Sequence, residues 1–266
     1  MKYVGSLDHW FIDRPIIERI EAFARQGINR IHIGGWRSRP MNELHVECYR
    51  LGVKLVSTFD DQMGCLTDPL DNDQTLQAWA ESLKMAESLG INHLYLFSNQ
   101  VSLVNDKEQV RALSAPYTAD KQWRNLIQQT EQILKLAEQT EVIILVQNIN
   151  RFDAATDLLI HNVETAAQLV QHFNHKQLRL AFDCYHQQRD SGNLIWNLVA
   201  HDGLYHSLTI ADVPSQGEPG TGEINFANLR TTLRELKFAG LVKLAFKPAD
   251  NEADSLARLR KLFPLD

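Results

Sequence analysis

The chain has 266 residues, of which 44% are hydrophobic and 23% are charged, and its formal net charge is −6. These values are typical of a globular protein, so a chain that is disordered throughout is excluded. The net charge is negative and the sequence contains no block of lysine and arginine, which argues against a nucleic-acid-binding protein.

Other features of the sequence bear on where the protein works. No segment approaches 18 consecutive apolar residues, so we expect no membrane span, and the first eight residues lack the pattern of a signal peptide. The three cysteines, Cys48, Cys65 and Cys184, are scattered and odd in number, which favours free thiols in a reducing compartment. We therefore expect a cytoplasmic protein whose partner is a small molecule rather than a nucleic acid or a membrane.

Short apolar runs typical of buried strands alternate with longer segments whose apolar residues recur at helical spacing. The strand-like runs are residues 2–5, 30–34, 54–59, 93–97, 142–146, 178–182, 207–211 and 241–246. Several helical segments end at a glycine before the next run, at Gly27, Gly52, Gly90 and Gly240. This repeated order predicts one domain over residues 1–266 with an α/β fold, a (β/α)₈ TIM barrel. A doubly wound open sheet is the alternative.

Polar or aromatic residues follow every predicted strand, at the end where such barrels carry their active sites. We expect several of these residues to contact a small-molecule substrate: His9, Trp36, Asp60, Asn99, Asn150, Asp212, Glu218 and Lys247. The longest irregular segments, 60–74 and 99–120, are expected to cover this face. A structural role is the alternative for any one of them, such as a turn at Asp60 and Asp61 or packing of Trp36.

Four strings in the second half of the chain carry a family resemblance. They are VQNIN at 146–150, FDCYHQQ at 182–188, IADVP at 210–214 and EPGTGEIN at 218–225. In these strings the chain resembles the hydroxypyruvate isomerase family, which belongs to the xylose isomerase-like (AP endonuclease family 2) TIM barrels. The similarity is clear over residues 141–250 and weaker over 1–140. It also suggests a subunit contact near the last string, so a homo-oligomer remains open.

The resemblance implies an isomerase in which Mg²⁺ or Mn²⁺ is held by a Glu, an Asp, a Gln or His, and a second Glu. The two glutamates move a proton between the carbons of a small hydroxy-carbonyl compound through an enediolate. This sequence differs at three of those positions, which carry Gln147, Thr209 and Ala245, and only Asp183 remains, beside the substrate-contacting His186. A neutral amide is no carboxylate base, and alanine offers no ligand. No cofactor is therefore assigned, and Asp183 is the ligand if a metal is bound.

The last predicted strand offers a replacement for the metal. Alternation places Lys243, Ala245 and Lys247 on one face, and Lys243 stands two positions, about 6.6 Å, before the missing glutamate. One hypothesis is that its ammonium reaches the vacated metal position and pairs with Asp183. The alternatives are that it reaches solvent at the barrel floor, or that Asp60 or Asp61 rebuilds a metal or acid/base site.

We therefore predict that four residues carry the chemistry: Asp183, His186, Lys243 and Gln147. The first hypothesis is an isomerase with an altered site. The second is a metal-independent or non-catalytic barrel that binds a small metabolite or does different chemistry with Asp183, His186 and Lys243.

Overall fold

The computed structural model describes residues 1–104, 107–154, 156 and 158–264. Parallel strands close into a barrel in the order β1-β10-β9-β8-β7-β4-β3-β2, which confirms the predicted fold. The open-sheet alternative is wrong, because β1 pairs with both β2 and β10. The barrel strands are β1 (Lys2–Ser6), β2 (Arg30–His32), β3 (Lys54–Thr58), β4 (His93–Leu96), β7 (Ile143–Gln147), β8 (Leu178–Asp183), β9 (Tyr205–Ile210) and β10 (Leu241–Leu244).

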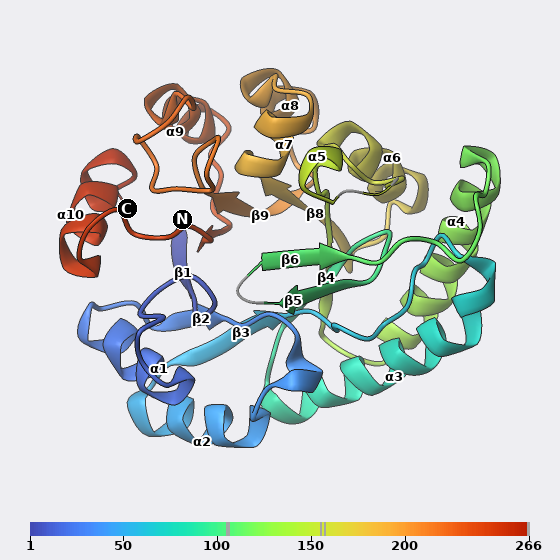
Figure 1. Ribbon diagram of the computed structural model, residues 1–266, viewed down its shortest axis with the longest axis horizontal. Helices are drawn as coiled ribbons and strands as arrows, with labels where there is room; N and C mark the ends of the chain where they lie inside the picture. Colours follow the sequence, from blue (N-terminus) through green and yellow to red (C-terminus); the bar gives the residue numbers. More distant parts are fainter. Residues whose placement is uncertain (105–106, 155, 157, 265–266) are drawn as a thin grey trace.

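Helices surround the barrel and bury their apolar faces against it (Figure 1). The longer helices are α1 (Ile16–Arg25), α2 (Met41–Leu51), α3 (Asn72–Leu89), α4 (Ala119–Ala137), α6 (Val163–Phe173), α9 (Phe226–Glu235) and α10 (Glu252–Leu262). The short ones are η1 (Trp36–Ser38), η2 (Pro69–Asp71), α5 (Arg151–Ala154), α7 (Cys184–Asp190) and α8 (Leu194–Ala200). None of the described helices is long and apolar enough to cross a membrane.

Glycines end two of these helices as predicted. Gly52 and Gly90 cap α2 and α3 with φ of 64° and 67°, a conformation that glycine adopts at no steric cost. Gly240 does not end α9, because the left-handed residue after that helix is Lys237, with φ of 52°. A side chain at Gly240 would instead place its Cβ 2.3 Å from the carbonyl oxygen of His206.

The segment 99–120, which we expected to be irregular, contains an antiparallel hairpin of β5 (Val101–Val104) and β6 (Lys107–Val110). The hairpin lies across the middle of the ring of elements in Figure 1. Its Leu103 packs on Gly34 at the end of β2, where a Cβ would come within 2.7 Å of the leucine side chain. The hairpin therefore covers the mouth of the barrel and adds its own side chains to the site.

Strand register places several inward-facing residues at one level of the barrel. Val4 of β1 is paired with Lys243 of β10, Lys243 with Thr209 of β9, and Thr209 with Asp183 of β8. Three of the residues singled out in the sequence are thus neighbours around one layer, although they come from strands far apart in the chain.

Candidate functional site

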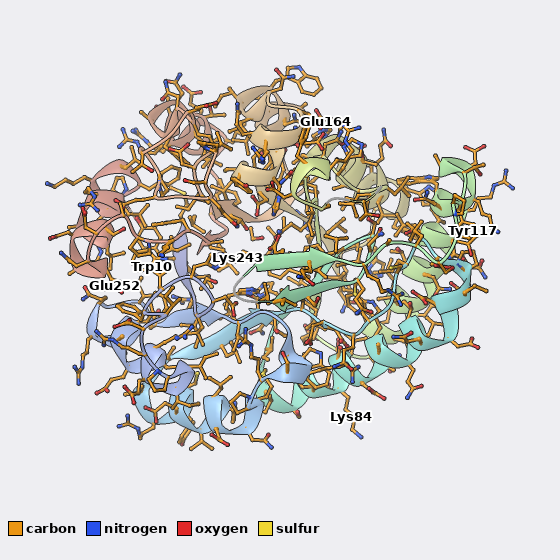
Figure 2. All side chains as sticks on the ribbon, viewed as in Figure 1. Trp10, Lys84, Tyr117, Glu164, Lys243 and Glu252 are labelled. Carbon is orange, nitrogen blue, oxygen red and sulfur yellow. The ribbon has the colours of Figure 1, made fainter. Side chains whose placement is uncertain are left out.

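Lys243 occupies the interior of the barrel. It is only 7% exposed, and Figure 2 shows it near the centre of the ring of elements. Its Nζ donates a hydrogen bond to Gln147 Oε1 at 3.3 Å and lies 4.0 Å from the centroid of the Tyr95 ring. The alternative that Lys243 reaches solvent at the barrel floor is therefore wrong.

Gln147 links this ammonium to Asp183. The amide accepts from Lys243 through Oε1 and donates through Nε2 to Asp183 Oδ2 at 3.3 Å. No ion pair in the described part of the chain joins Lys243 to Asp183 directly, so the pairing expected from the sequence runs through the amide. Burial raises the pKa of Asp183, and the hydrogen bond from the His186 backbone and the charge of Lys243 offset only part of this effect.

Asp183 also sets the position of His186. It is the N-cap of α7, where its Oδ1 accepts from the backbone N–H of His186 at 3.0 Å. The imidazole then extends toward the hairpin, and its Nε2 lies 3.1 Å from Oε2 of Glu108 on β6. The structure thus connects β8, α7 and the hairpin through one histidine.

The hydrogen bonds at His186 define its proton positions. The Asn150 amide accepts from the backbone N–H of Asp153 through Oδ1, so its Nδ2 is the group 2.8 Å from His186 Nδ1. The backbone N–H of Asn150 also donates to Nδ1. Burial lowers the pKa of His186, whereas Asp183 and Glu108 raise it to about 9. Two donors at Nδ1 oppose that charge effect, so we assign a neutral ring with its proton on Nε2.

The central pocket combines predicted residues with others that the sequence did not single out. Its lining is formed by Ser6, Asp8, His9, His32, Phe59, Phe97, Leu103, Glu108, Gln147, Asp183, Gln216, Lys243 and Ala245. The remaining space is about 20 Å³, enough for about one water. A larger ligand therefore requires lining side chains to move.

Five polar residues in this lining were missed by sequence reasoning: Ser6, Asp8, His32, Glu108 and Gln216. His32 lies in the interior of β2, and burial together with the charge of Lys243 holds its pKa well below the usual range, so the ring is neutral. Burial raises the pKa of Asp8 to about 6, although Arg39 and the Gly34 N–H favour its charged form. Gln216 has φ of 55°, a left-handed conformation unusual for glutamine, in the loop after β9. No local pattern in the sequence marks these residues.

Three predicted substrate contacts lie outside the central pocket. Asp60 forms an ion pair with Arg37 at 2.8 Å and accepts a hydrogen bond from Ser82 Oγ at 2.7 Å. Its carboxylate therefore binds residues outside the central pocket. The Trp36 indole N–H donates to Ser82 Oγ at 2.9 Å. Asn99 donates to the carbonyl oxygen of Arg111 at 3.1 Å and ties down the segment after β4. None of the three is among the residues that line the central pocket.

Three further residues hold loops in place. Asp212 accepts hydrogen bonds from the backbone N–H groups of residues 213, 220, 222 and 224, each at 2.9 Å. Glu218 is buried and accepts from Arg258 at 2.6 Å and from Ser255 Oγ at 2.6 Å. Lys247 is exposed and bridges to Gly217 through the backbone. Of the predicted substrate contacts, His9 lines the pocket and Asn150 contacts His186 beside it.

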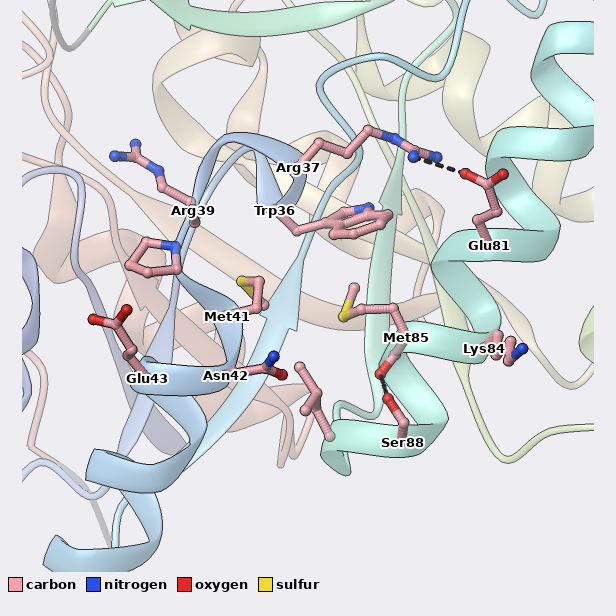
Figure 3. A pocket seen from close by; sticks show the side chains of 12 residues that line it. Trp36, Arg37, Arg39, Met41, Asn42, Glu43, Glu81, Lys84, Met85 and Ser88 are labelled. Atoms are coloured by element: carbon pink, nitrogen blue, oxygen red, sulfur yellow. Dashed lines mark hydrogen bonds and ion pairs between the residues drawn. The ribbon is translucent and has the colours of Figure 1, made fainter.

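A larger groove of about 630 Å³ lies on the outside of the barrel between α2 and α3. Figure 3 shows Trp36, Met41 and Met85 pointing into it and the ion pair between Arg37 and Glu81 at its rim. Its lining residues come from α2, α3 and the loop after β2, so the groove does not use the barrel interior.

The residues present do not fit a divalent metal. A hard dication prefers oxygen ligands, above all carboxylates. Of the expected positions only Asp183 is a carboxylate, Ala245 has no donor, and the Gln147 oxygen already binds an ammonium. The described residues contain no group of three or more His, Cys, Asp or Glu placed to hold a metal. Lys243 would also place a positive charge beside the ion.

Comparison with known proteins gives the family. The model of a protein family described as "Xylose isomerase-like TIM barrel" matches residues 18–262 of this chain. The chain belongs to this family. A 2-oxo-tetronate isomerase of Haemophilus influenzae is 22% identical over 270 residues, 98% of both chains. The hydroxypyruvate isomerase of Escherichia coli is 27% identical over 134 residues, covering 50% of this chain and 52% of the relative.

Two solved structures share the fold of this chain. An AP endonuclease family 2 protein from Brucella melitensis superposes with a TM-score of 0.85 at 19% identity, over 98% of both chains. A 3-keto-D-glucoside 4-epimerase from Escherichia coli gives 0.80 at 19% identity, over 98% of this chain and 99% of the other. The barrel and the hydroxypyruvate isomerase resemblance predicted from the sequence are both confirmed.

Proposed function

We propose that the protein is an isomerase or epimerase of a small hydroxy-carbonyl compound and that it works without a divalent metal. The Lys243 ammonium, held inside the barrel by Gln147 and Tyr95, is the observation that carries the proposal. Support comes from relatives named hydroxypyruvate isomerase and 2-oxo-tetronate isomerase, and from the fold shared with a sugar epimerase.

The ammonium provides what proton transfer next to a carbonyl group needs. Removing a proton from that carbon places negative charge on the carbonyl oxygen, and a fixed cation in a water-poor site stabilises this charge. Lys243 faces the same pocket as neutral His32, whose ring can donate a hydrogen bond but adds no competing charge. A lysine and a neutral histidine together can therefore bind the oxygens of an enediolate.

The neighbouring residues hold this cation in place. Gln147 accepts a hydrogen bond from Lys243 Nζ and donates one to Asp183. The Gln147 amide therefore links the ammonium to the carboxylate, which do not touch each other. The buried hydroxyls of Ser207 and Thr209 on β9 have no hydrogen-bond partner in the described part of the chain. Unpartnered buried hydroxyls are costly, so they are expected to bond water.

The test is proton exchange by the chelator-treated protein. The protein is incubated in D₂O with hydroxypyruvate and, separately, with neutral ketoses, and loss of each carbon-bound proton is followed by NMR against a protein-free control. We expect exchange or isomerisation of at least one compound, unchanged by chelator, and a loss of roughly 10²-fold or more in Lys243→Met. Activity that appears only after Mn²⁺ is added would refute the metal-free mechanism, and no exchange with any compound would refute the isomerase class.

A further inference from the structure

Three carboxylates face the central pocket, but they differ in what binds their oxygens. Asp183 accepts from Gln147 at one oxygen and from the His186 backbone at the other. Asp8 accepts from Arg39 at Oδ1 and from the backbone N–H of Gly34 at Oδ2. Both carboxylates are therefore occupied by the protein itself.

Glu108 is different. Its Oε2 lies 3.1 Å from His186 Nε2, and its Oε1 accepts no hydrogen bond from the described part of the chain. Its side chain is 25% exposed, and it lines both the central pocket and the adjoining cavity beside α7. A carboxylate with one oxygen held and one oxygen open is arranged to accept a proton from a ligand.

Resting on the proposed function, we propose that Glu108, carried over the barrel mouth by the β5–β6 hairpin, is the catalytic base. It replaces the carboxylates that are absent at Gln147 and Ala245 and takes the carbon-bound proton of the substrate. Unlike carboxylates at positions 147 and 245, which would project from the barrel wall, Glu108 enters the pocket from the hairpin above the strand ends.

Its surroundings keep Glu108 in the form that a base requires. Burial alone raises the pKa of its carboxyl, but the hydrogen bond from His186 and the positive charge of Lys243 lower that pKa below its usual value. The neutral His186 donates its Nε2–H to Oε2, which holds the carboxylate while Oε1 stays open. Leu103 packs against Gly34 and holds in place the hairpin that carries Glu108.

The step balances without any other reagent. Glu108 Oε1 takes the proton from the carbon next to the carbonyl, and the C–H electron pair forms the carbon–carbon double bond of the enediolate. The carbonyl electron pair moves to the oxygen, which the Lys243 ammonium protonates. Lys243 regains a proton from the neighbouring hydroxyl, whose oxygen becomes the new carbonyl, and Glu108 returns its proton to the other carbon.

The test compares Glu108→Gln, Glu108→Asp and the neighbouring control Gln109→Ala, whose exposed side chain lies one residue along β6. Each variant is assayed for exchange in D₂O on the compound that the wild type turns over, across pH 3–9, with folding checked by circular dichroism at each pH. We expect Glu108→Gln to lower the rate roughly 10²–10⁴-fold, Glu108→Asp to retain part of it, and Gln109→Ala to stay near wild type. We also expect the wild-type rate to fall at low pH as Glu108 is protonated, and Glu108→Gln to lose this acid limb.

The possible outcomes separate the two proposals. A wild type that exchanges protons while Glu108→Gln keeps its rate within threefold would overturn the role of Glu108 alone. A small loss with the acid limb unchanged would make Glu108 a residue that only positions His186, which also overturns it. A folded wild type with no exchange on any compound would refute the proposed function, and the catalytic role of Glu108 with it.

Discussion

Replacing Lys243 by methionine tests whether the barrel interior depends on an internal cation. Methionine keeps the length and apolar stem of the side chain but removes its charge and its donors. The buried Gln147 oxygen then loses its hydrogen-bond donor, and Asp183 loses the cation that its charge faces across the amide. The perturbation therefore changes electrostatics more than packing.

The size of the effect follows from these contacts. An unsatisfied buried acceptor costs about 1–3 kcal/mol, and loss of the cation over the Tyr95 ring adds up to about 2 kcal/mol. Burying methionine instead of an ammonium offsets part of this, so we expect a net loss of about 2–4 kcal/mol at pH 8.

The cost should depend on pH in a definite direction. Burial raises the pKa of Asp183 and Lys243 lowers it, so removing Lys243 raises it further. A carboxyl whose pKa is raised in the folded state lowers the free energy of unfolding as pH rises through that pKa. Lys243→Met should therefore be more destabilising at pH 8 than at pH 5, where Asp183 takes up a proton more readily.

The assay is urea unfolding followed by circular dichroism at both pH values. Lys84→Met is the matched control, because Lys84 is exposed on α3 and projects away from the barrel in Figure 2. It should change the free energy of unfolding by less than about 0.5 kcal/mol. Wild-type stability of Lys243→Met at both pH values would refute the internal-cation interpretation.

Three further predictions concern metal binding and stability. The chelator-treated wild type should show no stoichiometric Mn²⁺ binding in titration calorimetry. The combined variant Lys243→Ala, Gln147→Glu and Ala245→Glu should gain such binding. Equal heats from both proteins would contradict the conclusion that the wild-type residues do not fit a divalent metal. Asp8→Asn loses acceptor contacts to Arg39 and Gly34 at every pH, but relative to the wild type its free energy of unfolding should rise by about 1–3 kcal/mol between pH 4 and pH 7. The reason is that the pKa of Asp8 is raised to about 6, so its charged form costs stability as pH rises; a constant difference in urea melts across pH would argue against it. Glu218→Gln should cost about 1–3 kcal/mol at pH 7, measured by thermal unfolding, and less in acid, where the depressed pKa of Glu218 is reached; an unchanged melting temperature would contradict its anchoring role.

The barrel itself was predictable because its signals are local. Alternating apolar runs mark all of the barrel strands, and glycines at 52 and 90 mark the ends of helices that stop there for reasons of backbone conformation. The hairpin was missed because its strands, β5 and β6, are only four residues long each. Its position over the mouth depends on Leu103 fitting against Gly34, a contact between distant segments.

The candidate site also combines features that residue type alone decides with features that depend on contacts between distant segments. The sequence by itself determined that Gln147 and Ala245 cannot serve as carboxylate ligands or bases, since residue type alone decides that chemistry. Only the tertiary structure decided which charged groups meet: Asp60 is bound by a distant arginine outside the pocket, Lys243 turns inward, and Glu108 arrives on a hairpin. The physical reason is that a charged side chain takes its place from its partners, and these partners are brought together only when the barrel closes.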